Sequence, residues 1–134
     1  MGVGLGFAIA AATVTGSPVV AVEGDSALGF SGMELETICR YRLPVTVVVM
    51  NNGGIYKGDA PSPDQDQLAP TRLGTNTHYD QITTAMGGTG VHVRTSADLG
   101  HALDAAIRSG LPSLIDAEID PHVGTESGHL TKMN

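Results

Sequence analysis

Cysteine, tryptophan and basic residues are scarce in this sequence. The single cysteine, Cys39, excludes a disulfide within the chain and is typical of a protein from a reducing compartment. Seven Lys and Arg residues stand against 14 acidic residues, which gives a net charge of −7, and the basic residues form no stripe. Nucleic acids and anionic membrane surfaces are therefore poor partners for this protein.

Long apolar runs are missing as well. No stretch reaches the roughly 18 residues that a membrane-spanning helix needs, and the first residues lack the basic segment of a signal peptide. Hydrophobic residues nevertheless make up 41% of the chain, which is enough to build a buried core. We expect a cytoplasmic protein that binds neither membrane nor nucleic acid.

What is present is an alternation of short β-branched runs with helical patterns. The apolar runs at 19–22 and 45–50 predict buried strands, the first of them buried on both faces. Two further strands are predicted at 91–94 and 113–117. Helices are predicted at 6–15, 31–41, 77–86 and 96–107, and we expect Ser31, Thr77 and Ser96 to cap the last three. This order is typical of an α/β fold, a parallel sheet flanked by helices.

The pattern also predicts how the chain is divided. Residues 1–119 form one domain, and residues 120–134 form a tail without periodicity. Met1 runs almost directly into the first apolar helix, whereas a complete domain usually has a lead-in. We therefore expect that the domain is truncated at its N-terminus and that Met1 is an internal residue, with an initiator methionine as the alternative.

Polar residues follow two of the predicted strands at the point where each strand ends. Asp25 follows the first and Asn52 the second, 27 residues later, which is close to the ~30 residues of a strand–helix–strand unit. A carboxylate, an amide oxygen and a main-chain carbonyl at Gly53 or Gly54 would suit Mg²⁺, with diphosphate oxygens as further ligands. Backbone N–H groups near Ser26 could take the phosphate charge. The alternative is that these residues only form turns.

The two motifs resemble a known signature. Gly24-Asp25-Ser26, 24 intervening residues and Asn51-Asn52 are similar to the thiamine-diphosphate motif of the decarboxylase and acetolactate synthase superfamily. Ser26 replaces the usual glycine, as in oxalyl-CoA decarboxylases and the related 2-hydroxyacyl-CoA lyases. Residues 24–59 and the segment 120–128 resemble the oxalyl-CoA decarboxylase family, and the resemblance covers nearly the whole chain.

This resemblance implies a domain that binds the diphosphate of thiamine diphosphate together with Mg²⁺. It matches Asp25 and Asn52 to metal ligands and Gly54 to a ligand through its carbonyl oxygen. It matches Met1 to the bulky apolar residue over which the cofactor bends. The other residues that it places at the cofactor are Gly24, Ser26, Ala27 and Ile55.

Two further residues take catalytic roles by the same resemblance. Tyr56 matches a tyrosine near the reacting carbon, and Ser127 matches a serine in a tail that closes over the acyl-CoA substrate as a lid. A packing aromatic and a solvated serine are the plainer interpretations. The five histidines show no ligand spacing, so we expect them at the surface or in helices.

The implied reaction is decarboxylation of oxalyl-CoA to formyl-CoA and CO₂, with 2-hydroxyacyl-CoA cleavage as the alternative. For the protein at full length we expect a homo-oligomer, either a dimer or a tetramer. The glutamate that activates the cofactor lies in a separate pyrimidine-binding domain, so this chain alone is expected to be inactive. Two other hypotheses stay open: a non-catalytic phosphate-binding module, and a small subunit with a separate pyrimidine-binding partner.

Overall fold

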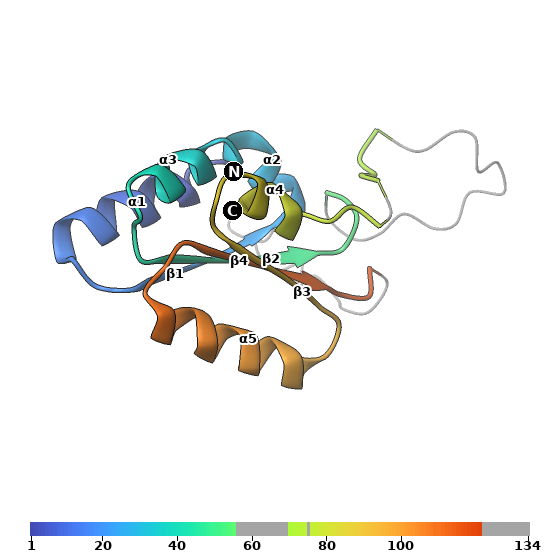
Figure 1. Ribbon diagram of the computed structural model, residues 1–134. Coiled ribbons are helices and arrows are strands. Elements are labelled where there is room, and N and C mark those ends of the chain that lie inside the picture. The colour runs from blue at the N-terminus through green and yellow to red at the C-terminus, as the bar shows by residue number, and fades with distance from the viewer. Residues whose placement is uncertain (56–69, 75, 122–134) are drawn as a thin grey trace, which may run out of the picture.

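Four parallel strands form one sheet in the computed structural model, which describes residues 1–55, 70–74 and 76–121 (Figure 1). The strands are β1 (Val19–Gly24), β2 (Val45–Asn51), β3 (Thr89–Val93) and β4 (Ser113–Glu118), in the spatial order β1-β2-β4-β3. The helices are α1 (Gly4–Thr15), α2 (Asp25–Ser31), α3 (Glu34–Arg40), α4 (Asp80–Ala85) and α5 (Ser96–Ser109). The predicted fold class, a parallel sheet flanked by helices, is confirmed.

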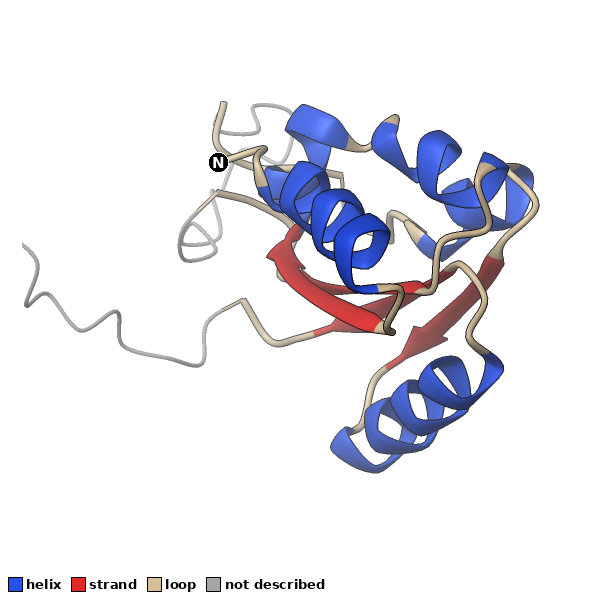
Figure 2. Cartoon of the chain, turned by 90° about the vertical axis from the view of Figure 1, so that its left-hand side faces the viewer, coloured by secondary structure: helices blue, strands red, loops and turns tan. Residues whose placement is uncertain are grey.

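The helices divide unequally between the two faces of the sheet. Helices α1 to α4 cover one face, whereas α5 lies alone on the other (Figures 1 and 2). The chain moves across the sheet from β1 to β2 to β3 with its helices on the first face, and then returns to β4 through α5. Because crossovers between parallel strands keep one hand, reversing the direction of travel places the connecting helix on the opposite face.

Two apolar clusters fill the two sides of the sheet. The larger cluster joins α1, α2 and α3 to one face of β2, and the smaller joins α5 to the other face of β2 and to β4. Adjacent residues Val47 and Val48 are both buried, one in each cluster. The prediction of a buried strand is therefore confirmed for β2, and β4 is buried on both faces as well.

The prediction of burial on both faces is wrong for β1, and β3 is exposed in a similar way. Both are edge strands, and their residues alternate between more and less exposed. Val20 and Val22 lie on the α5 side of β1, where α5 does not reach, and Val22 is 65% exposed. No helix in the described ranges is long and apolar enough to cross a membrane.

The predicted starts of three helices also need correction. Ser31 ends the additional helix α2 instead of capping α3, which begins at Glu34. Thr77 donates its hydroxyl to the Gly74 carbonyl at 2.8 Å and does not cap α4. Thr95, one residue before the predicted cap, accepts the Asp98 N–H at the start of α5. At Thr77 a local hydrogen bond to a turn replaces the cap, whereas the Ser31 hydroxyl has no hydrogen-bond partner.

Close approach between α4 and β3 requires a glycine. A Cβ atom at Gly90 would lie 2.0 Å from the carbonyl oxygen of Asp80, so any other residue would push the helix away from the strand. This contact brings the N-terminal end of α4 against the sheet beside β3 and β4.

Candidate functional site

The carboxyl ends of β1 and β2 meet at one edge of the sheet. The register pairs Val19 with Val45 and continues to Gly24 opposite Met50, so both strands end at the same level. Asp25 begins α2 directly after β1, and Asn52 follows directly after β2. In open parallel sheets this edge is where ligands bind.

The oxygens of Asp25 and Asn52 converge on one backbone nitrogen. The Gly54 N–H donates to Asp25 Oδ2 at 3.0 Å and lies 3.3 Å from Asn52 Oδ1. The second oxygen of Asp25 accepts the Ser26 N–H at 2.7 Å. The structure therefore brings together the three residues that the sequence assigned to a metal, Asp25, Asn52 and Gly54.

Asp25 is a buried carboxylate with no cationic side chain as its partner in the described ranges. It is 1% exposed, and burial raises the pKa of its carboxyl group above the ordinary value. Backbone N–H groups of Ser26, Gly53 and Gly54 oppose this pKa shift, and the nearby carboxylate of Asp116 adds to it. A buried negative charge of this kind is stabilised when a cation binds beside it. The site thus fits a metal ion by its donors and by its charge.

Two glycines shape the loop that carries the third candidate ligand. Gly53 has φ +73°, a left-handed conformation that suits glycine, and its carbonyl accepts the Leu73 N–H at 2.9 Å. A Cβ atom at Gly54 would lie 2.8 Å from the carbonyl oxygen of Thr71. Because the Gly53 carbonyl is already engaged, the Gly54 carbonyl is the better candidate of the two.

The remaining residues predicted at the cofactor lie at the end of β1, in α2, after β2 and at the N-terminus. Gly24 ends β1, and Ser26 and Ala27 lie in the first turn of α2. Ile55 donates its N–H to the Thr71 carbonyl, and Met1 is exposed. Tyr56 and Ser127 lie outside the described residues, so their catalytic roles stay predictions. The lid role of residues 120–134 also stays a prediction, because residues 122–134 lie outside the described residues.

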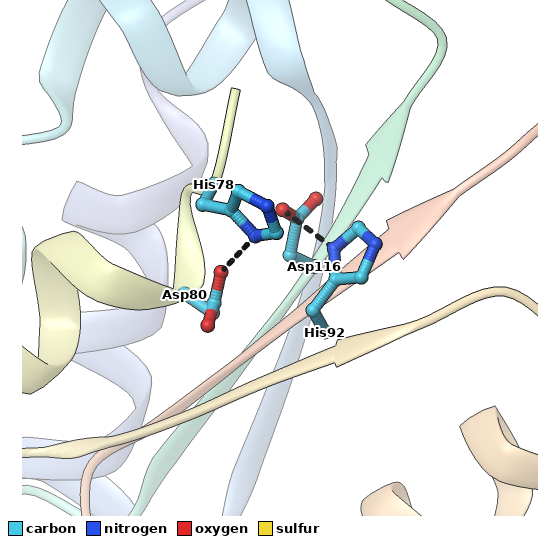
Figure 3. Close-up of side chains that lie close together, drawn as sticks. All are labelled: His78, Asp80, His92 and Asp116. Atoms are coloured by element: carbon cyan, nitrogen blue, oxygen red, sulfur yellow. Dashed lines mark hydrogen bonds and ion pairs between the residues drawn. The ribbon is translucent and has the colours of Figure 1, made fainter. Parts of the chain in front are cut away.

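A second group of polar side chains lies nearby, and it was not predicted from the sequence. His78, Asp80, His92 and Asp116 each offer a ligand atom, and these atoms lie within 4.8 Å of one another (Figure 3). The expectation that the histidines lie at the surface or in helices holds for the exposed His78, whereas His92 is a half-buried residue of strand β3. The available signal was Asp116, a charged residue in the middle of the apolar strand β4.

The sequence matches a known protein family over most of its length. The family described as "Thiamine pyrophosphate enzyme, C-terminal TPP binding domain" matches residues 1–117. The chain belongs to this family. Thiamine pyrophosphate and thiamine diphosphate are two names for one cofactor, and members of this family bind it together with Mg²⁺.

Individual members of the thiamine-diphosphate family are similar over the whole chain. Oxalyl-CoA decarboxylase of Escherichia coli (strain K12) is 54% identical over 135 residues, covering 100% of this chain and 24% of that protein. A 2-hydroxyacyl-CoA lyase of Oryza sativa subsp. japonica is 47% identical over 141 residues, again 100% of this chain and 24% of the relative. The human 2-hydroxyacyl-CoA lyase 1 is 46% identical, with 90% of this chain and 24% of its own length covered. The chain thus spans about a quarter of the length of these relatives.

Proposed function

We propose that this chain supplies the diphosphate- and Mg²⁺-binding half of the active site of an oxalyl-CoA decarboxylase. The observation that carries the proposal is the convergence of Asp25 and Asn52 on the Gly54 N–H, at the edge of a thiamine-diphosphate-binding domain. Identity of 54% to the Escherichia coli oxalyl-CoA decarboxylase supports the choice of reaction.

In this proposal each residue at the edge has a defined part. Asp25 provides the charged metal ligand, and Asn52 and the Gly54 carbonyl provide two neutral oxygens, a donor set that Mg²⁺ prefers. The Ser26 N–H donates to Asp25 Oδ1 and holds the carboxylate in place, and phosphate binding by backbone N–H groups near Ser26 stays a prediction. Bound thiamine diphosphate supplies a carbon nucleophile that can also accept the electron pair left by decarboxylation.

The runner-up is cleavage of 2-hydroxyacyl-CoA, favoured by the 47% identity to the Oryza sativa lyase. The two are distinguished by comparing kcat/KM for oxalyl-CoA and for a long-chain 2-hydroxyacyl-CoA in the protein at its full natural length. We expect oxalyl-CoA to be preferred. A ratio in favour of the hydroxyacyl substrate would replace the decarboxylase assignment with the lyase.

We also propose that catalysis needs parts beyond these 134 residues. The ring-activating glutamate expected from the family lies in a pyrimidine-binding domain, and loss of a proton-transfer group typically costs about 10²–10⁴ in rate. The 134-residue chain with Mg²⁺ and thiamine diphosphate should therefore form no formyl-CoA, whereas the full-length control should. Turnover by the short chain would show that its site is complete. The homo-oligomer and the cytoplasmic location stay predictions.

A further inference from the structure

The four side chains of His78, Asp80, His92 and Asp116 come from separate segments of the chain. His78 precedes α4, Asp80 begins α4, His92 lies in β3 and Asp116 in β4, and the four side chains lie close together as the pairs His78–Asp80 and His92–Asp116 (Figure 3). Gly90 makes this possible because it lets α4 approach β3 closely. We propose that these residues, called here the His/Asp cluster, bind one transition-metal ion of the Zn²⁺ class.

Distances within the His/Asp cluster match the edges of a small coordination polyhedron. A tetrahedral ion with bonds of about 2.0–2.1 Å holds its ligand atoms about 3.3 Å apart. His92 Nδ1 lies 3.2 Å from Asp116 Oδ2, and His78 Nδ1 lies 3.3 Å from Asp80 Oδ1. The four ligand atoms lie up to 4.8 Å apart, so the pair His78–Asp80 must move toward the pair His92–Asp116 to bind one ion. The His78 side chain is 43% exposed, which leaves it room to rotate.

The charge of the cluster calls for a cation. Asp116 is fully buried, and no Lys or Arg pairs with either carboxylate in the part of the chain that the structure describes. Asp80 Oδ1 is buried and has no hydrogen-bond partner, although the His78 ring lies beside it. A carboxylate oxygen left in this state is costly unless an ion takes it up.

Outer hydrogen bonds orient the ligands. Asp116 Oδ1 accepts from Asn51 Nδ2 at 3.0 Å, and Asp116 Oδ2 accepts from the Tyr79 N–H at 3.1 Å. His92 presents Nδ1 to the cluster, while Nε2 lies 3.2 Å from Glu118 Oε2 as an ion-pair contact without a hydrogen bond, and Glu118 Oε2 also accepts the Arg94 Nε–H at 2.9 Å. A carboxylate on the far nitrogen of a ligating histidine is the usual outer partner in zinc sites, where it fixes the tautomer and raises ligand basicity.

The choice of ion follows from the donor atoms. Two imidazole nitrogens with two carboxylates suit Zn²⁺ and its neighbours, whereas Mg²⁺ prefers oxygen alone. An entry path exists, because His78 and His92 line a cavity of about 150 Å³ that also borders Asn51, Asn52 and Glu118. The cluster is therefore separate in chemistry from the Mg²⁺ site, and the inference does not depend on the proposed reaction.

The test uses the protein at its full natural length, stripped with a chelator and titrated with Zn²⁺ or Co²⁺. We expect one equivalent of Co²⁺ to give visible absorption of tetrahedral intensity. His92→Ala should lose that equivalent, with affinity lowered more than the roughly 100-fold that loss of an outer partner can cost. Glu118→Gln should lower the affinity by about 10- to 100-fold. Asp25→Asn should retain the tetrahedral signal.

His101→Ala is the matched control, because His101 is an exposed histidine on α5 outside the cluster. Circular dichroism of each variant separates lost binding from lost fold, and His78→Ala replaces His92→Ala if the latter unfolds, since His78 is the more exposed ligand. Absence of a tetrahedral signal in the wild type overturns the proposal. So does a His92→Ala or His78→Ala variant that binds as well as His101→Ala, which would leave only a hydrogen-bonded network.

Discussion

Two groups of candidate ligands lie at the same edge of the sheet, and they are built differently. Asp25, Asn52 and Gly54 belong to segments that leave the ends of two strands, and backbone N–H groups hold them. The His/Asp cluster instead draws His92 and Asp116 from within strands, and side chains of other elements hold them.

The difference in donor atoms determines which ion each group can select. The first group offers one buried carboxylate and neutral oxygens, a hard set that leaves coordination positions for phosphate and water. The second offers two nitrogens and two carboxylates in a nearly closed set, which needs no ligand from outside. One edge of one sheet can thus carry an open site and a closed site a short distance apart.

Neutralising Asp25 should have the largest effect, and it tests whether the first group binds a metal ion. Asp25→Asn removes the only charged ligand of the first group, so Mg²⁺-dependent retention of thiamine diphosphate should fall by more than about 100-fold. Retention is measured by calorimetry or by gel filtration with absorbance detection. Retention at the wild-type level would show that Asp25 is not a metal ligand.

The same substitution should act in the opposite direction on the metal-free fold. Burial raises the pKa of Asp25, so its native state favours the protonated form, and its contribution to stability falls as pH rises through the native pKa. At neutral pH, with a chelator present, Asp25→Asn should therefore unfold at a temperature equal to or above that of the wild type. A clear drop in that temperature would mean that the charge stabilises the empty site.

Substitution of Gly90 should destabilise the contact between α4 and β3 that brings the second group together. Gly90→Ala forces α4 away from β3, and overpacking of this kind typically costs about 1–3 kcal/mol of unfolding free energy. The control is Gly100→Ala in α5, where an added Cβ meets nothing within 4 Å and should stabilise the helix by about 0.5–1 kcal/mol. Denaturant titrations measure both, and equal effects would contradict the close approach at Gly90.

A substitution that destabilises the fold without contacting either group shows how much metal affinity depends on stability alone. Thr95→Ala removes the side-chain cap of α5 and should cost about 1 kcal/mol. Thr13→Ala in α1 is its control, because the Thr13 hydroxyl donates to the Ile9 carbonyl in the preceding turn of its own helix. Mg²⁺ and Zn²⁺ affinities should be unchanged in both, and a loss of affinity in Thr95→Ala would tie α5 to one of the sites.

The smallest effect is expected at the single cysteine. Burial, followed by the carboxylate of Glu36, raises the pKa of the Cys39 thiol, so little of it is thiolate at neutral pH. Alkylation by iodoacetamide should be slower in the native protein than in the denatured protein and should speed up as pH rises. Cys39→Ser should leave cofactor retention unchanged, and a large loss would assign this thiol a role in binding.

The first group could be predicted from the sequence because its residues stand beside strand ends and glycines. A continuous apolar run marks the strand, and the polar residues that follow must reach the edge where neighbouring strands finish. The prediction that Asp25 and Asn52 lie close together needed only the assumption that β1 and β2 are neighbouring strands. The alternation of strands and helices, and hence the fold class, followed from the same patterns.

The second group could not be predicted because it depends on strand order. Asn51 and Asp116 are 65 residues apart in sequence, and they meet only because β4 lies next to β2. Strand order also explains the error at β1, whose apolar run cannot reveal that one of its faces lies beyond the reach of α5. Asp116 inside an apolar strand was the one local sign, but a charge alone does not name its partners.

Asn51 connects the two groups. Its side chain bonds to Asp116 and to the Thr77 carbonyl, and its main chain continues directly into Asn52. A shift of Asp116 toward an ion would therefore pull on the residue next to a predicted Mg²⁺ ligand. Free-energy coupling between two binding events is reciprocal, so any tightening of the cofactor by one ion would be matched by an equal tightening of that ion by the cofactor. Through Asn51, binding of an ion by the His/Asp cluster would thus change the affinity of the neighbouring Mg²⁺ site, and the reverse.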